Sequence, residues 1–440
     1  MTNTVALPGA LLLGDLHGSL SDPLLDSMMF LNEVTSRFPD AISFAPGRPY
    51  EGLFEPDRIH DYLAAYTDYL VRERGYQPDQ VRTALFQYGR TNGEIHGLIA
   101  RTLANDENLH VPPESVVVTV GAQEGMLLAL RALFAGPDDV LLAAAPCYIG
   151  ITGAARLLDI PVVGMPEGAD GLDPDLVAST AARVRSAGRR PRALYVVPDF
   201  ANPSGASMSV SNRHRLLDVA RDADLVVIED NPYGFFTRDD VFRPTLKSLD
   251  AERRVIYLGS FAKTCFPGAR LGYAVADQDV VDAAGNHSLL ADQFAKIKSM
   301  ITVNTPSLSQ AVIGGILAAN DCHLRRANRD TIMFYRANME RLLGELGRHF
   351  PASLRASLGV DWNSPGGGFF VVVTVPFVAD GAALTRSARE YGVLWTPMDA
   401  FYFDGGGRHQ MRLSCSYVEP DRLVEGVRRL AAFITDQSGR

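Results

Sequence analysis

Short runs of consecutive apolar residues recur through the first two thirds of the chain, with segments of helical spacing between them. The runs that predict strands lie at 115–120, 140–145, 193–197, 225–229 and 255–258. They are apolar at successive positions rather than at alternate ones, as is typical of strands buried on both faces. Apolar residues three or four positions apart predict helices at 57–74, 123–134 and 211–222. This alternation predicts an α/β fold with a mixed, mostly parallel sheet flanked by helices.

The pattern changes after about residue 300. It predicts a long helical region at 307–350, a strand at 369–375, a helix at 382–391, a strand at 410–416 and a C-terminal helix from about 419. These elements indicate a second, smaller α+β domain. We therefore expect an arm at 1–56 that also forms part of the small domain, a large domain at 57–320 and the rest of the small domain at 321–440.

Composition excludes several classes of protein. The 440 residues are 47% hydrophobic and 21% charged, which is typical of a packed globular chain. A net charge of −9 argues against binding to nucleic acid. We expect no membrane span, since no apolar run reaches about 18 residues. The start of the chain lacks the basic residues of a signal peptide, and the four cysteines lack CxxC spacing, so we expect a cytoplasmic protein without disulfides. The nine histidines show no metal-ligand spacing, and we expect no metal site.

Small and polar residues follow the carboxyl ends of the predicted strands, where open α/β sheets bind ligands. In chain order these residues are Gly121, Ala122, Gln123, Tyr148, Asn202, Asp230, Tyr233, Ser260, Lys263 and Arg270. A helix N-terminus and an arginine suit a phosphate group, and an aromatic side chain suits a flat ring. A lone carboxylate suits a basic ring nitrogen, and a lysine amine can bond to an aldehyde. Together these groups describe a site for pyridoxal 5′-phosphate.

Only four lysines occur in the chain, so chemistry that needs an amine has few candidates. Lys263 follows a strand predicted to be buried. Lys296 and Lys298 lie on a predicted helix and are expected to be solvated, and Lys247 is expected in a loop. Lys263 is therefore the candidate for covalent chemistry.

Five motifs in order carry a resemblance to a known family. They are Gly121-Ala122-Gln123, Asn202-Pro203-Ser204-Gly205, Asp230-Asn231-Pro232-Tyr233, Ser260-Phe261-Ala262-Lys263 and Arg412-Leu413-Ser414. The sequence resembles the fold-type I, pyridoxal-phosphate-dependent aminotransferases of class I/II, from about residue 44 to 431. The resemblance implies the same fold and amino-group transfer.

The resemblance also implies a role for each candidate. Lys263 would bond to the cofactor's aldehyde and act as general base, and Asp230 would pair with the ring nitrogen. The remaining implied cofactor contacts are Tyr233 and Asn202 on the phenolic oxygen, Tyr148 stacked on the ring, and Ser260, Arg270 and the 121–123 turn on the phosphate. Arg412 would bind the substrate carboxylate, with Asn202, Gly47 and Arg48 also at the substrate. Tyr88 would reach the phosphate of a partner subunit, which implies a homodimer with shared sites.

For Tyr88, Tyr148 and Arg48, packing in the core is an open alternative.

Segments 44–49 and 365–370 resemble the kynurenine/α-aminoadipate branch of the family. Segments 30–33 and 38–50 resemble, more narrowly, the aminotransferases that form hydroxyphenylglycine and dihydroxyphenylglycine for glycopeptide antibiotics. This implies an aromatic amino acid such as tyrosine as the amino donor and an aryl 2-oxo acid as the acceptor.

Three other functions are open. The first is a general aromatic, kynurenine or α-aminoadipate aminotransferase. The second is another reaction of the same cofactor, namely oxidation, elimination or cyclisation of an amino acid. The third is a non-catalytic, cofactor-binding module of a transcriptional regulator. The third requires a DNA-binding segment before this fold, for which a resemblance that starts at about residue 44 leaves no room.

Overall fold

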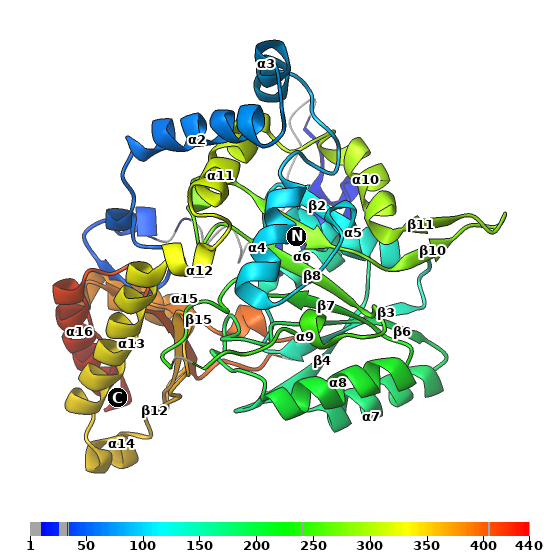
Figure 1. Ribbon diagram of the computed structural model, residues 1–440. Coiled ribbons are helices and arrows are strands. Elements are labelled where there is room, and N and C mark those ends of the chain that lie inside the picture. Colours follow the sequence, from blue (N-terminus) through cyan, green and yellow to red (C-terminus); the bar gives the residue numbers. More distant parts are fainter. Residues whose placement is uncertain (1–9, 26–32, 34, 240, 404, 440) are drawn as a thin grey trace.

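The computed structural model describes residues 10–25, 33, 35–239, 241–403 and 405–439 (Figure 1). A central sheet has the strand order β2-β9-β8-β7-β6-β3-β4-β5. Its strands are β2 (Val116–Thr119), β3 (Asp139–Ala145), β4 (Val162–Gly168), β5 (Gly171–Leu172), β6 (Arg190–Val196), β7 (Val226–Asp230), β8 (Val255–Ser260) and β9 (Gly272–Val275). Strands β4, β3, β6, β7 and β8 run parallel, whereas β9 is antiparallel to both of its neighbours. The predicted mixed, mostly parallel sheet is confirmed.

All five predicted strands belong to this sheet, and their continuous apolar runs have the expected cause. Leu141 of β3 packs into the core on one face, and its neighbour Leu142 packs into the core on the other. Strands β4, β5 and β9 of this sheet were not predicted, and β5 has only two residues. The run of β4 contains Gly164 and Pro166, which interrupt a strand pattern, and β9 has only four residues.

Helices cover both faces of the sheet. Helices α5 (Gly121–Leu133), α6 (Ile149–Leu157) and α10 (Leu290–Ile301) share one core cluster with it. Helices α7 (Pro174–Ser186) and α8 (Val210–Asp222) share the other, and Figure 1 shows these two side by side. Short elements complete this part: α9 (Leu246–Leu249), β10 (Asp279–Val281) and β11 (His287–Leu289).

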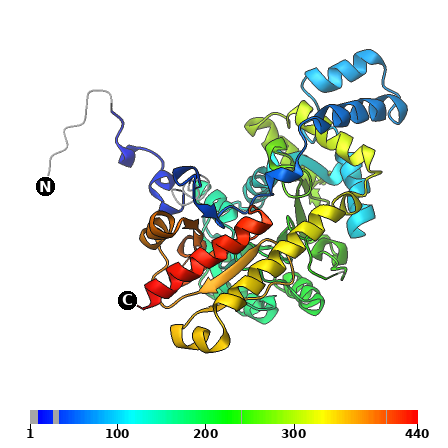
Figure 2. The same ribbon diagram turned by 90° about the vertical axis from the view of Figure 1, so that its left-hand side faces the viewer.

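A further group of helices stands at one end of the sheet: α2 (Arg58–Arg72), α3 (Pro78–Phe86), α4 (His96–Glu107) and α11 (Ser307–Ala319). Figure 2 shows α2 and α3 projecting from the rest of the molecule. Helix α2 lies close against α11, because Gly315 leaves room for the Tyr62 carbonyl where a Cβ would collide with it.

The prediction of one helical region at 307–350 was too simple. Three helices occupy it: α11, α12 (Leu324–Ala327) and α13 (Arg329–His349). The chain breaks after α11 because Asp321 and Cys322 take positive φ angles of 51° and 56°, which helical backbone does not allow.

The smaller unit has a four-stranded sheet of order β12-β13-β16-β15. Its elements are β12 (Asp361–Trp362), β13 (Phe370–Thr374), β15 (Thr396–Pro397), β16 (Gln410–Ser414), α14 (Ala352–Leu358), α15 (Gly381–Arg386) and α16 (Pro420–Ser438). Figure 2 shows α13 and α16 side by side across this sheet. A π-helical turn, Ser387–Tyr391, directly follows α15.

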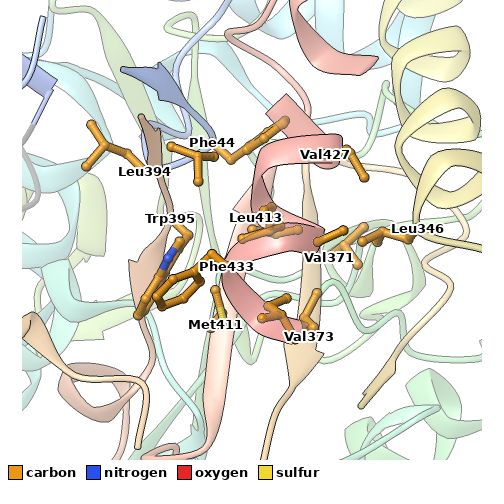
Figure 3. Packing of buried hydrophobic residues seen from close by; sticks show 14 of the residues in the cluster. Phe44, Leu346, Val371, Val373, Leu394, Trp395, Met411, Leu413, Val427 and Phe433 are labelled. Carbon is orange, nitrogen blue, oxygen red and sulfur yellow. The ribbon is translucent and has the colours of Figure 1, made fainter. Parts of the chain in front are cut away.

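The N-terminal segment contributes to the core of this smaller unit. Strand β1 (Ile42–Ser43) pairs in parallel with β14 (Val393–Leu394). Phe44 is fully buried and packs in one cluster with Leu413 and Phe433 (Figure 3). The division into an arm at 1–56 that forms part of the small domain, a large domain at 57–320 and the rest of the small domain at 321–440 stays a prediction. Among the described residues, no helix combines the length and the apolar character needed to cross a membrane.

Candidate active site

A cavity of about 380 Å³ opens at the carboxyl ends of the central strands. It is lined by every predicted site residue except Tyr88, namely Gly47, Arg48, Gly121, Ala122, Gln123, Tyr148, Asn202, Asp230, Tyr233, Ser260, Lys263, Arg270 and Arg412. Tyr88 lies beyond the end of α3 and is 83% exposed. The fold therefore brings together, within one chain, residues from seven separate segments.

Lys263 lies in the turn after β8, and its amine is inside the cavity. Nζ donates a hydrogen bond to the Gly47 carbonyl at 2.6 Å, which links the central sheet to the N-terminal segment. Burial lowers the pKa of Lys263 from 10.5 to about 8, and the charges of Arg270 and Arg412 act in the same direction. A sizeable fraction of this amine is therefore neutral, and so nucleophilic, near pH 7–8.

Asp230 ends β7 with one carboxylate oxygen satisfied and the other free. Oδ2 accepts a hydrogen bond from the Tyr195 hydroxyl at 2.7 Å, and the buried Oδ1 has no partner. Burial raises the pKa of Asp230 from 3.8 to about 6, while the bond from Tyr195 opposes the rise. An unpartnered buried carboxylate oxygen is costly, so this one is suited to a cationic N–H group.

Tyr195 was missed as a site residue. It lies inside an apolar strand 35 residues before Asp230, and only the pairing of β6 with β7 brings the two together. The available signal was weak: a buried tyrosine hydroxyl needs a hydrogen-bond partner, but its sequence does not say which one.

The turn before α5 is shaped for an anion. The helix begins at Gly121, two residues earlier than predicted, and Gly121 has a φ of +71°. A Cβ on this glycine would lie 2.7 Å from the Arg270 guanidinium, so glycine allows the arginine to approach the helix N-terminus. Backbone N–H groups and a fixed positive charge thus face the same space.

Arg412 enters the cavity from β16 of the smaller unit. Its guanidinium donates to Asn202 Oδ1 at 2.6 Å and to the Ala45 carbonyl at 2.8 Å, and it lies over the Phe370 ring at 4.5 Å. Its buried Nε has no partner. Burial lowers the pKa of Arg412 to about 10, so the group is still cationic at neutral pH.

The cavity is strongly biased toward anions. Among the described residues that line it, Arg48, Lys263, Arg270 and Arg412 are basic, and Asp230 is the single acidic residue. Such a cavity suits a ligand that carries a phosphate or a carboxylate at more than one position.

Comparison with known proteins decides the family. The family described as "Aminotransferase class I and II" matches residues 71–430. The chain belongs to this family. It is therefore an aminotransferase with the fold-type I architecture predicted from its motifs, and members of the family use pyridoxal phosphate.

Two curated relatives and one solved structure are similar over most of the chain. A (S)-3,5-dihydroxyphenylglycine transaminase of Amycolatopsis orientalis is 51% identical over 96% of this chain and 94% of its own. An aromatic-amino-acid aminotransferase of Thermococcus litoralis is 30% identical, covering 90% and 89%. The crystal structure of Pyrococcus horikoshii kynurenine aminotransferase, in complex with PMP, is 27% identical with a TM-score of 0.78, covering 92% and 94%. The predicted resemblance to the kynurenine/α-aminoadipate branch and, more narrowly, to the dihydroxyphenylglycine aminotransferases is confirmed.

Two predictions about the lysines of this aminotransferase were wrong. Lys298 is fully buried and forms an ion pair with Glu124 at 2.8 Å, and Lys247 is buried on α9 and pairs with Asp277 at 2.5 Å. Neither is solvated or in an open loop, because each finds a carboxylate that compensates its burial. Lys296 is exposed as expected. Of the four lysines, Lys263 alone lines the cavity.

The residues for which core packing was an open alternative differ in their surroundings. Tyr148 is partly buried at the start of α6 and lines the cavity. Arg48 also lines it, but its exposed guanidinium lies over the Tyr417 ring at 4.3 Å. Tyr88 is on the surface. Tyr88 and Arg48 are therefore not core residues, whereas Tyr148 both packs against the core cluster of α5 and α6 and lines the cavity. The roles of all three in the aminotransferase stay predictions.

Gly121→Ala is expected to weaken cofactor binding to the aminotransferase about tenfold. The new methyl group both strains a residue at φ +71° and displaces Arg270 from the anion site, a combined loss of about 1–2 kcal/mol. Equilibrium titration of the apoprotein with pyridoxal phosphate measures the change. Gly136→Ala is the control, since a Cβ there meets nothing within 4 Å; equal affinity in both variants would contradict the assignment.

Proposed function

We propose that this aminotransferase binds pyridoxal phosphate in the cavity and transfers the amino group of an aromatic amino acid, such as tyrosine, to an aryl 2-oxo acid. The product would be a hydroxyphenylglycine or dihydroxyphenylglycine used in antibiotic biosynthesis. The observation that carries this proposal is the 51% identity, over nearly the whole chain, to a dihydroxyphenylglycine transaminase.

The residues of the cavity fit the cofactor. Asp230 Oδ1 is buried without a partner, as a carboxylate that pairs with a ring nitrogen would be before the ring binds. Gly121 leaves a space beside Arg270 that a Cβ would fill, next to the first backbone N–H groups of α5. Lys263 supplies an amine whose lowered pKa favours bonding to an aldehyde.

We assign the predicted cofactor contacts on this basis. Asp230 would hold the ring nitrogen, and Tyr148 would stack on the ring. The remaining contacts would be Tyr233 and Asn202 at the phenolic oxygen, and Ser260, Arg270, Gly121, Ala122 and Gln123 at the phosphate. Pyridoxal phosphate, when bound, supplies an aldehyde carbon and a ring that accepts electrons from the substrate's α-carbon.

The chain's own groups would bind the substrate and move its proton. Arg412 would hold the α-carboxylate, because Asn202 and the Ala45 carbonyl fix its guanidinium and leave Nε free. Lys263 Nζ would take the proton from the α-carbon as general base and then release it as general acid. Its pKa of about 8 suits both tasks near neutral pH.

The lining next to Arg412 supports an aromatic substrate. Phe401 lies 5.2 Å from its guanidinium and packs in one apolar cluster with Ile149, and both line the cavity. An arylglycine carries its ring directly on the α-carbon, so the ring would lie close to the carboxylate clamp. An apolar surface at that distance favours an aryl group over a second carboxylate.

The test is a panel of amino acids and 2-oxo acids supplied to the purified holoenzyme, with product amino acids identified by mass spectrometry. We expect transfer between tyrosine and hydroxyphenylglyoxylate or dihydroxyphenylglyoxylate, at a kcat/KM at least about tenfold above that with 2-oxoadipate or kynurenine. Transfer only with kynurenine, 2-aminoadipate or glutamate would replace the proposal by the general aminotransferase. Release of an oxo acid without any amino product would indicate another reaction of the cofactor.

We also propose a homodimer with shared sites, located in the cytoplasm. Exposed apolar side chains near the end of α3, Phe86 and Tyr88, support an interface there. The four free cysteines support a reducing compartment.

Mixing Lys263→Met subunits with Tyr88→Ala subunits tests the shared sites. In a dimer, the mixture is expected to contain one intact site per heterodimer, so its activity should exceed that of either variant assayed alone. If each site were formed by one subunit only, the activity of the mixture would be the average of the two variants.

A further inference from the structure

Two buried side chains, Lys298 and Glu124, and the partly buried Thr302 join the end of α10 to the start of α5. Lys298 Nζ donates to Glu124 Oε2 at 2.8 Å and to Thr302 Oγ1 at 2.9 Å, and Thr302 Oγ1 donates to Glu124 Oε1 at 2.6 Å. Lys298 is fully buried, and Glu124 is 7% exposed. The three groups form a closed triangle in which each polar group compensates the burial of another.

This triangle is connected to the turn that opens α5. Glu124 Oε2 also accepts the backbone N–H of Val120 at 2.7 Å, and Val120 directly precedes Gly121. From the loop after α10, Thr305 donates to the Val118 carbonyl at 2.8 Å. The segment that contains Lys298 therefore holds the junction between β2 and α5 at two separate points.

The position of Glu124 calls for a neutralising partner. It is an acidic residue in the first turn of α5, whose N-terminus attracts anions through its backbone N–H groups. A second anion bound at the same N-terminus would be repelled by an unpaired carboxylate there. Lys298 cancels that charge and leaves both carboxylate oxygens as hydrogen-bond acceptors. Stability alone explains the pair poorly, because apolar residues in its place would be about as stable.

We propose that Lys298 is a positioning residue for the cofactor: through Glu124 it fixes the 121–123 turn and keeps the N-terminus of α5 receptive to the phosphate group. Neither Lys298 nor Glu124 lines the cavity, so both act through the turn. The inference rests on the proposed function, because it takes the phosphate of pyridoxal phosphate to bind at this turn.

The experiment is an equilibrium titration of apoproteins with pyridoxal phosphate, followed by absorbance, together with urea unfolding of each apoprotein. Lys298→Met is expected to weaken the affinity about tenfold or more, because it leaves Glu124 unpaired beside the phosphate. The double variant Glu124→Gln/Lys298→Met is expected to recover most of this loss, since glutamine keeps an acceptor for Val120 without the charge. A residue that serves stability alone would show no such recovery.

Lys247→Met is the matched control. Lys247 is also a buried lysine with a carboxylate partner, Asp277, but it has no contact with the α5 turn. We expect this control to lose stability and to bind pyridoxal phosphate as tightly as the unmodified protein.

Each outcome decides between distinct conclusions. Unchanged affinity in folded Lys298→Met, or an equal loss in Lys247→Met, would overturn this inference and leave the proposed function intact. Failure of the unmodified apoprotein to bind pyridoxal phosphate would overturn the proposed cofactor and this inference with it. Should Lys298→Met not fold, Thr302→Val provides the test, because it opens the triangle without creating an unpaired charge. It is expected to weaken affinity about threefold, and an unchanged affinity would overturn the inference.

Discussion

Lys263→Met is expected to abolish amino-group transfer while leaving the apoprotein at least as stable as before. Loss of the general base alone lowers kcat by about 10²–10⁴-fold, and loss of the covalent attachment adds to this, so we expect a decrease of at least about 10³-fold. The amine hydrogen-bonds the Gly47 carbonyl and lies inside the cavity. No other lysine lines that cavity, so none can replace it.

The stability of the same variant separates a functional lysine from a structural one. The folded-state pKa of Lys263, about 8, lies below its unfolded value of 10.5. Between these values the unfolded chain binds more protons than the native protein, so the stability of the unmodified protein rises with pH across that window. Below pH 8 the cost of burying the ammonium is fully present, and methionine removes it. We expect a gain of about 1–3 kcal/mol in the free energy of unfolding at pH 7.

Steady-state kinetics and urea unfolding of the apoproteins at pH 7 measure both effects. Lys296→Met is the control, because Lys296 is exposed and outside the cavity, and it should change neither quantity. Borohydride reduction of the loaded enzyme followed by peptide mass spectrometry should place the cofactor on Lys263. Attachment to another lysine, or substantial activity in Lys263→Met, would contradict the assignment.

Asp230→Asn is expected to lower kcat/KM by about 10²–10³-fold, because a neutral amide stabilises a positive charge on the ring nitrogen far less than a buried carboxylate does. The amide is nearly the same size and keeps an acceptor for the Tyr195 hydroxyl. The change therefore tests the charge of Asp230 rather than its shape.

The apoprotein of this variant should also lose a specific pH dependence. The folded-state pKa of Asp230 is raised from 3.8 to about 6, so between these values the native protein binds more protons than the unfolded chain. The stability of the unmodified apoprotein therefore falls as pH rises through that window. Asparagine does not titrate and carries no charge that burial penalises, so we expect the variant to be more stable at pH 7 by about 1–3 kcal/mol.

Unfolding free energies of the two apoproteins at pH 4, 5, 6 and 7 give the measurement. Asp61→Asn, at an exposed position on α2, is the control. Its free energy of unfolding should change from pH 4 to pH 7 as much as that of the unmodified apoprotein does. A stability difference that stays constant from pH 4 to 7, or full activity in Asp230→Asn, would show that the carboxylate does not carry the proposed charge.

The sequence by itself determined the kind of fold and the kind of site. Runs such as 225–228 are apolar at every position, which suits a strand covered on both faces, so a sheet between helices followed. The end of a strand can be predicted from the local sequence, and parallel strands bring their carboxyl ends to one edge of the sheet. The residues after each strand, from Gly121 to Arg270, were therefore expected together, and all of them line one cavity.

What a local pattern could not determine is which distant residues meet. The Tyr195–Asp230 bond depends on the pairing of two strands, and the Lys263 contact with Gly47 depends on how the N-terminal segment packs into the smaller unit. Lys298 was expected in water for the same reason: helical spacing gives the face of a residue but not what covers that face. The tertiary structure placed Glu124 opposite it, and a buried charge is tolerated only where such a partner lies within hydrogen-bond distance.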